Sequence, residues 1–109
     1  MNLSTQLPNG LVPAQKVGFM RCDFTTGSLA NSWKQIKDDM STSELHEVQQ
    51  HVNDIMNQVP SYQWIVELCG GEGLENAENR FAESENFFYW VSFIPIYDSY
   101  HFYVYAYRK

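Results

Sequence analysis

One group of residues has the types and spacing that hydrolytic or metal chemistry requires. Glu47, His51 and Asp54 stand four and three residues apart, so a helix over residues 41–59 would carry them on one face. Carboxylates and an imidazole at this spacing can bind a metal ion. The face is opposite the apolar stripe of the same helix, and the sequence indicates no further ligand. We interpret the group as a network on a solvated face and expect no metal and no enzymatic activity.

Two other motifs are incomplete as chemical sites. The glycine-rich segment Gly70–Gly73 could bind an anion with its backbone amides, but it lacks the Lys-Ser/Thr of a P-loop, and its glutamate would repel phosphate. Cys22 could act as a nucleophile with a distant histidine, but nothing in the sequence favours this, and a buried structural thiol is the simpler interpretation. Cys22 and Cys69 are the only cysteines, and no secretory signal accompanies them. We expect free thiols, a cytoplasmic location and no cofactor.

Charge is distributed unevenly along the chain. The 109 residues include 7 basic and 13 acidic ones, for a net charge of −6, which argues against a protein that tracks nucleic-acid phosphates. Eleven acids and a single base, Arg80, fall between Asp38 and Glu85, a local balance of −10. This segment is either an ordinary solvated surface or a surface that steers a basic partner into contact. Its densest part consists of Glu72, Glu75, Glu78, Glu83 and Glu85.

Aromatic residues concentrate near the end of the chain. Eleven of the seventeen lie in residues 87–107, in two predicted strands that form a hairpin. Phe102, Val104 and Ala106 would face the core, which leaves a second face that is also aromatic. Either cross-strand pairing and the N-terminal arm cover that face, or it is an interface, where tyrosine is common. The interface interpretation gives three further partner-binding candidates: Tyr103, Tyr105 and Tyr107.

Periodicity predicts the elements that position these residues. Apolar and polar residues alternate at 17–24 and 62–69, as in strands, and the strands of the aromatic hairpin are 87–96 and 100–108. Residues 74–86 are acidic, and we predict a loop there with a short helix anchored by Leu74, Ala77 and Phe81. A first helix is predicted over 28–40 from the spacing of Leu29, Trp33, Ile36 and Met40.

The second predicted helix, over 41–59, has the clearest pattern in the chain. Ser41 and Glu44 match a capping box at its start, and Pro60 ends it. Its apolar stripe should pack on strands that carry Trp64, Val66, Phe102 and Val104. The stripe consists of Leu45, Val48, Val52, Ile55, Met56 and Val59.

Together these elements predict an α+β fold, with an antiparallel sheet of about four strands and two helices packed on one face. We expect residues 1–15 to form an irregular arm and residues 16–109 to form a single domain. No segment is long and apolar enough for a membrane span.

Three short segments resemble contact-dependent growth-inhibition immunity proteins, which are small cytoplasmic α+β proteins that bind and neutralise a toxin domain. They are Asn31-Ser32-Trp33 at the start of a helix, Phe88-Tyr89-Trp90-Val91, and Tyr103-Val104-Tyr105. The resemblance implies the class of toxin neutraliser and no particular binding residues. A phage- or plasmid-encoded inhibitor of a host defence protein fits the same features.

The sequence therefore favours a small acidic inhibitor that binds a basic protein stoichiometrically, such as a nuclease, a toxin or another nucleic-acid-handling protein. It favours neither direct nucleic-acid binding nor membrane binding. A self-associating structural or virion protein, beginning with a homodimer, is the alternative from another class. A small metal-dependent hydrolase built on Glu47, His51 and Asp54 is the third.

Overall fold

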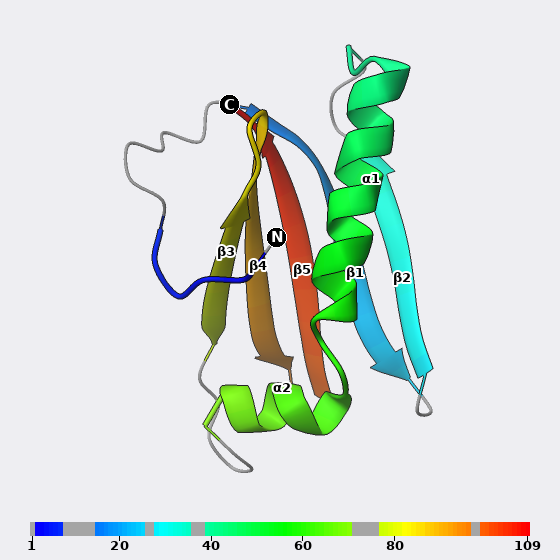
Figure 1. Cartoon of the computed structure of the whole chain (residues 1–109). Helices are drawn as coiled ribbons and strands as arrows, with labels where there is room; N and C mark the ends of the chain where they lie inside the picture. The colour runs from blue at the N-terminus through cyan, green and yellow to red at the C-terminus, as the bar shows by residue number, and fades with distance from the viewer. Residues whose placement is uncertain (1, 8–14, 26–27, 36–38, 71–76, 97–98) are drawn as a thin grey trace.

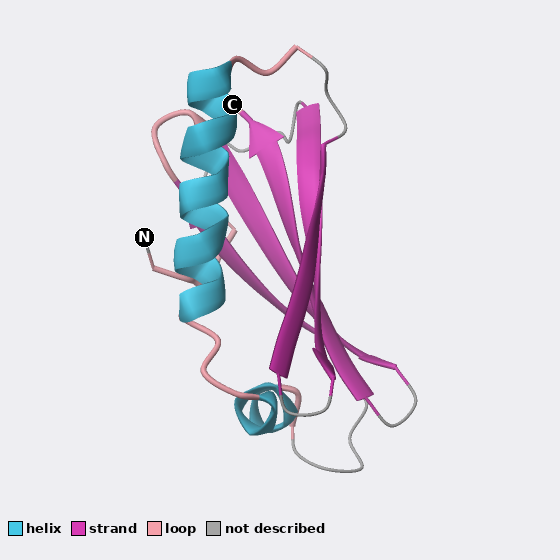
Figure 2. Ribbon diagram, turned by 90° about the vertical axis from the view of Figure 1, so that its right-hand side faces the viewer, coloured by secondary structure: helices cyan, strands magenta, loops and turns pink. Residues whose placement is uncertain are grey.

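The computed structural model describes residues 2–7, 15–25, 28–35, 39–70, 77–96 and 99–109. Within these residues, five strands form one antiparallel sheet in the order β2-β1-β5-β4-β3. Two helices, α1 and α2, lie against the same face of that sheet (Figures 1 and 2). The elements in chain order are β1 (Gln15–Thr25), β2 (Ser28–Gln35), α1 (Thr42–Asn57), α2 (Tyr62–Leu68), β3 (Glu78–Glu83), β4 (Phe87–Ile96) and β5 (Ser99–Arg108). The predicted α+β class is confirmed, with one strand more than the four expected.

The core lies between α1 and the sheet. Val48, Val52 and Ile55 of α1 are fully buried, which confirms the predicted apolar stripe. Because side chains alternate along a strand, the sheet offers every second residue to this core. Phe102 and Val104 of β5 are among them, as predicted. The buried set on the strands is Val17, Met20, Cys22, Ala82, Phe87, Tyr89, Val91, Phe93, Phe102, Val104 and Ala106.

The start of α1 has the capping box that the sequence indicates. The Ser41 hydroxyl accepts a hydrogen bond from the Glu44 backbone N–H at 3.1 Å, and the Glu44 carboxylate accepts one from the Ser41 N–H at 3.1 Å. This second bond holds the pKa of Glu44 below its ordinary value, and the charge of Arg108 lowers it further. Arg108 also donates to Asp39 at 3.3 Å. The cap therefore ties the start of α1 to the end of β5.

The helix predicted over 28–40 is wrong. Residues 28–35 form β2, which pairs with β1 from Ser28 opposite Thr25 to Gln35 opposite Gly18. Leu29 and Trp33 are four residues apart, and an even spacing also keeps two residues on one face of a strand. Asn31-Ser32-Trp33 therefore lies in a strand and not at a helix start, which removes one feature of the resemblance to immunity proteins. Ile36 lies outside the described residues.

The strand predicted over 62–69 is also wrong. This segment is α2, whose N-cap Ser61 accepts a hydrogen bond from the Trp64 N–H at 3.2 Å. Ile65, Val66 and Cys69 are buried, a spacing of one and four residues that suits a helix face. Trp64 and Val66 therefore reach the interior from a helix, where the sequence suggested a strand.

The third difference is at 74–86, where a loop with a short helix was expected. The described part contains β3, paired with β4 from Glu78 opposite Phe93 to Glu83 opposite Phe88. Pairing with an apolar neighbouring strand outweighs the weak helical pattern of this acidic segment. The aromatic hairpin is confirmed as β4 and β5, paired along their whole length.

Candidate functional site

The face of the sheet turned away from the helices is aromatic. In Figure 2 the helices lie on one side of the sheet, and no described helix or loop lies over the other. We call this second surface the outer aromatic face. The register sets its members side by side across four strands, since Tyr105 lies opposite both Phe19 and Trp90. The face consists of Phe19, Phe81, Phe88, Trp90, Tyr103, Tyr105 and Tyr107.

Tyr105 stands at the centre of this face. Its ring centroid lies 5.6 Å from that of Trp90, 5.9 Å from that of Tyr103 and 6.2 Å from that of Phe19. The ammonium of Lys16 lies 4.5 Å from the same ring, a cation–π contact. Tyr105 therefore connects the residues of this face. Removal of its ring would remove one contact from each of its four neighbours: Phe19, Trp90, Tyr103 and Lys16.

Rings nearer the β3 edge pair across strands. Phe88 lies 5.8 Å from Tyr107 and 6.0 Å from Phe81, centroid to centroid. The Trp90 indole N–H donates to the Asn79 side-chain oxygen at 2.9 Å. Cross-strand pairing thus accounts for part of the aromatic content, as one interpretation of the sequence held. Trp90 nevertheless remains 36% exposed, and the three tyrosines are half-buried.

The described part of the N-terminal arm reaches this face only at its β3 edge. Leu3 packs against the core beside α1, and Ser4 pairs with Phe81 at the edge of β3. In Figure 1 the segment then runs beside the outer edge of β3, where Gln6 and Leu7 line a pocket together with Phe81. Cover by residues 2–7 is therefore confined to the edge at Phe81, and residues 8–14 lie outside the described residues.

Ring orientation decides what the face can bind. Tyr103 and Tyr105 are nearly parallel, with 12° between their planes, so each turns one ring face toward the other. Lys16 lies over the Tyr105 ring. Stacking of nucleic-acid bases needs free ring faces, and the Tyr105 ring already has Tyr103 and Lys16 against it. Tyrosine combines apolar area with a hydrogen-bonding group, which suits a protein surface.

The pKa values of Tyr105 and Tyr107 are raised, so both hydroxyls keep their protons at neutral pH. Burial raises the pKa of Tyr105 above its ordinary value, and the neighbouring Tyr103 raises it further. Burial likewise raises the pKa of Tyr107, with a contribution from Tyr105. Both hydroxyls are therefore available as hydrogen-bond donors to a partner.

The predicted acidic candidates are not gathered at this face. Glu78 accepts a hydrogen bond from the Arg80 guanidinium at 3.1 Å, and Glu83 accepts one from the Lys109 ammonium at 2.8 Å. Glu85 is exposed between β3 and β4. The remaining two candidates, Glu72 and Glu75, lie outside the described residues.

Most described acids lie on the helical side of the molecule instead. We call this surface the acidic helical side. The acidic helical side lies across the sheet from the outer aromatic face. Lys16 and Arg21 are exposed on the outer aromatic face. Arg21 lies opposite Tyr103 in the register. The acidic helical side and the outer aromatic face are therefore two separate surfaces, whereas Glu78 and Glu83 of the acidic segment lie in β3, directly beside β4. The acids of the helical side are Asp39, Glu44, Glu47, Asp54 and Glu67.

His51 does not belong to a solvated network, which corrects the prediction for this group. It is half-buried, and its Nδ1 lies 2.8 Å from the hydroxyl of Tyr89 in β4. Tyr89 is fully buried, and burial raises the pKa of its phenol, with a further contribution from the charge of Glu47. The sequence did not indicate that His51 and Tyr89 form a pair, because 38 residues separate them. Among the described residues, no three His, Cys, Asp or Glu side chains form a metal-binding group.

Both thiols, Cys22 and Cys69, are free and buried, and burial raises the pKa of Cys69. In the part of the chain that the structure describes, neither helix has the length and apolar character of a membrane span.

Comparison of the chain with protein-family models, with curated proteins and with solved structures finds no match. The function is therefore argued from the geometry of the two surfaces.

Proposed function

We propose that the protein is a cytoplasmic inhibitor that binds one partner protein stoichiometrically and that the outer aromatic face is its contact surface. The observation that carries this proposal is an aromatic sheet face that no described element covers, on which Trp90 is 36% exposed, five rings are half-buried and Phe88 is buried. Apolar surface of this kind on small proteins commonly marks interaction sites. Tyrosine and tryptophan are enriched among the residues that contribute most to binding.

The proposed partner is basic overall, such as a nuclease or a toxin. A net charge of −6 attracts a basic protein at long range and speeds association. At contact distance the outer aromatic face carries Lys16 and Arg21, so the part of the partner that meets it would be apolar with acceptor groups. In this proposal, the acidic helical side sets the association rate, and the aromatic residues set the lifetime of the complex.

Capture with the full chain, followed by identification of the bound protein, tests the proposal. The isolated pair should form a one-to-one complex in light scattering, and the partner's activity should fall in proportion to the added protein. A partner whose activity is unchanged in a saturated complex would exclude inhibition. Inhibition would also be excluded if the protein bound the partner only as its substrate or as a subunit of an assembly.

Self-association through the same face is the second candidate, because a flat aromatic surface also suits a second copy. Light scattering over a wide concentration range separates the two. The inhibitor proposal predicts a monomer throughout. A dimer whose formation is abolished by substitution of Tyr103 would favour the structural alternative.

A further inference from the structure

One edge of the sheet is paired with the N-terminal segment of the chain. The Ser4 N–H donates to the Phe81 carbonyl at 2.7 Å, and the Phe81 N–H donates to the Ser4 carbonyl at 2.8 Å. These two bonds form an antiparallel bridge at the free edge of β3. The Leu3 N–H donates to the Gln58 side chain at 3.2 Å, and the Leu3 side chain packs against the core. Residues 3 and 4 thus act as a very short additional strand.

This strand uses little of the edge. Both backbone groups of Phe81 point away from β4 toward Ser4, so those of Asn79 and Glu83, two residues away on either side, point the same way. The Asn79 carbonyl accepts a hydrogen bond from the Arg80 side chain at 2.8 Å. In a continued antiparallel register, Gln6 would lie opposite Asn79, but the described residues form no such bridge. The edge therefore has room for a longer strand than the one it holds.

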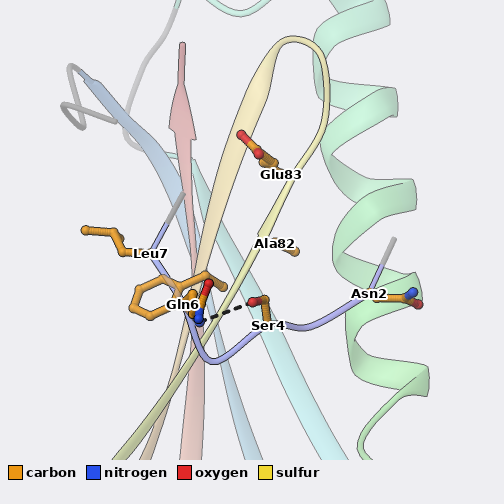
Figure 3. Close-up of a pocket in the computed structure, with 7 residues that line it drawn as sticks. Asn2, Ser4, Gln6, Leu7, Ala82 and Glu83 are labelled. Carbon is orange, nitrogen blue, oxygen red and sulfur yellow. Dashed lines mark hydrogen bonds between the residues drawn. The ribbon is translucent and has the colours of Figure 1, made fainter. Parts of the chain in front are cut away.

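The N-terminal segment turns away just after the bridge. The Ser4 hydroxyl accepts a hydrogen bond from the Gln6 N–H at 3.1 Å, shown as a dashed line in Figure 3. A pocket of about 330 Å³ lies between this turn and β3. Leu7, beyond the turn, is 57% exposed. The pocket is lined by Asn2, Ser4, Gln6, Leu7, Phe81, Ala82 and Glu83.

We infer that the β3 edge is a strand-accepting site for an extended segment of a partner protein, and that residues 2–7 occupy it in the free protein. The seated segment defines the chemistry of the ligand. It is an extended backbone with an apolar side chain in the place of Leu3, a small hydroxyl residue in the place of Ser4, and further residues that pair with Asn79. Main-chain hydrogen bonds would provide affinity and the Leu3 position would provide selectivity. This site adjoins the outer aromatic face at Phe81, whose backbone pairs with Ser4 and whose ring stacks with Phe88, but it uses main-chain groups and not the rings.

The test uses a labelled synthetic peptide of residues 1–9 and the full-length chain carrying Ser4→Pro. Proline removes the N–H that donates to Phe81 and leaves β3 unchanged, so it weakens the internal occupant alone. The Ser4→Pro protein should bind the peptide at least about tenfold more tightly than the wild-type protein, in which the tethered segment competes at high effective concentration. Amide NMR signals of residues 79–83 should shift on binding.

Three controls make the result decisive. Ser4→Ala keeps both backbone bonds and should bind the peptide no better than wild type. A peptide with proline in the place of Ser4 should not bind. Tyr103→Thr, on the outer aromatic face, should leave peptide binding unchanged, so that failure of the proposed function and failure of this inference are distinguishable. If a folded Ser4→Pro protein, verified by circular dichroism, binds the peptide no better than wild type, the β3 edge is not a strand-accepting site.

Discussion

The two faces of β5 differ in what covers them and in the residues that they carry. Phe102, Val104 and Ala106 are fully buried beneath the helices, whereas the tyrosines between them are half-buried on the uncovered face. The covered residues are purely apolar, and the uncovered ones each combine a ring with a hydroxyl. A strand that needed only one buried face would alternate apolar with charged or small polar residues. The use of tyrosine instead supports the proposal that the second face contacts another protein.

The largest difference in stability between the two faces is expected when a charge is placed in the covered face. Val52→Asp puts an unpaired carboxylate among fully buried residues of α1 and the sheet. We expect a loss of roughly 3–5 kcal/mol in the free energy of unfolding, comparable with much of the stability of a small domain. Urea denaturation measures it. Asn53→Asp, on the exposed side of the same turn, is the matched control and should change stability by less than about 0.5 kcal/mol.

Alkaline pH should weaken the covered face through the buried phenol of Tyr89. The pKa of Tyr89 is raised in the folded state, so the folded protein retains a proton that the unfolded chain loses above pH 10 or so. Its contribution to stability is complete below that pH and is lost as pH rises further, by up to about 1.4 kcal/mol per pH unit.

Urea denaturation from pH 9 to 11 measures this slope for the wild-type protein and for Tyr89→Phe. The substitution should flatten the slope, although Tyr105 and Tyr107, whose pKa values are also raised, keep part of it. It should also cost roughly 1–2 kcal/mol at neutral pH, because the His51 ring loses its hydrogen-bond partner. An unchanged slope in Tyr89→Phe would mean that another group causes the alkaline loss.

A smaller effect is expected at the helix start that connects the two layers. Ser41→Ala removes the hydroxyl that caps α1 and should lower stability by about 1 kcal/mol. Thr42→Ala, one residue on, makes no capping bond among those described and should have less than half that effect. Thermal unfolding of the two variants side by side measures the difference. Equal losses would show that the capping hydroxyl contributes nothing specific.

The helix α1 and the aromatic hairpin were predictable from sequence. The helix α1 has both a capping box and an apolar stripe, and the aromatic hairpin has a concentration of aromatic residues in two alternating runs. The wrong helix over 28–40 also had two signals, a cap residue at Ser28 and the spacing of Leu29, Trp33, Ile36 and Met40, but a spacing of four satisfies a strand as well as a helix. At 62–69 the alternation favoured a strand, and the cap at Ser61 was the signal that could have corrected it.

The candidate site was predictable in part. The tyrosines of β5 could be assigned to one face because the period of a strand is two. Phe19 and Trp90 could not be joined to them, because the register of β1 and β4 against β5 depends on long-range pairing. The pairing of His51 with Tyr89 and of Ser4 with Phe81 depends on the same long-range assembly.

The most direct test of the central claim compares one substitution on each surface for binding to the captured partner. Tyr103→Thr removes a ring from the outer aromatic face and retains a residue that favours strands. Glu67→Lys reverses an exposed charge on the acidic helical side. Both proteins should stay folded, with stability changes under about 1 kcal/mol. We predict that Tyr103→Thr raises the dissociation constant at least about tenfold, mainly through faster dissociation. Glu67→Lys should alter the association rate alone, by a few-fold. Wild-type affinity in Tyr103→Thr together with a large loss in Glu67→Lys would contradict the claim and place the contact surface on the helical side.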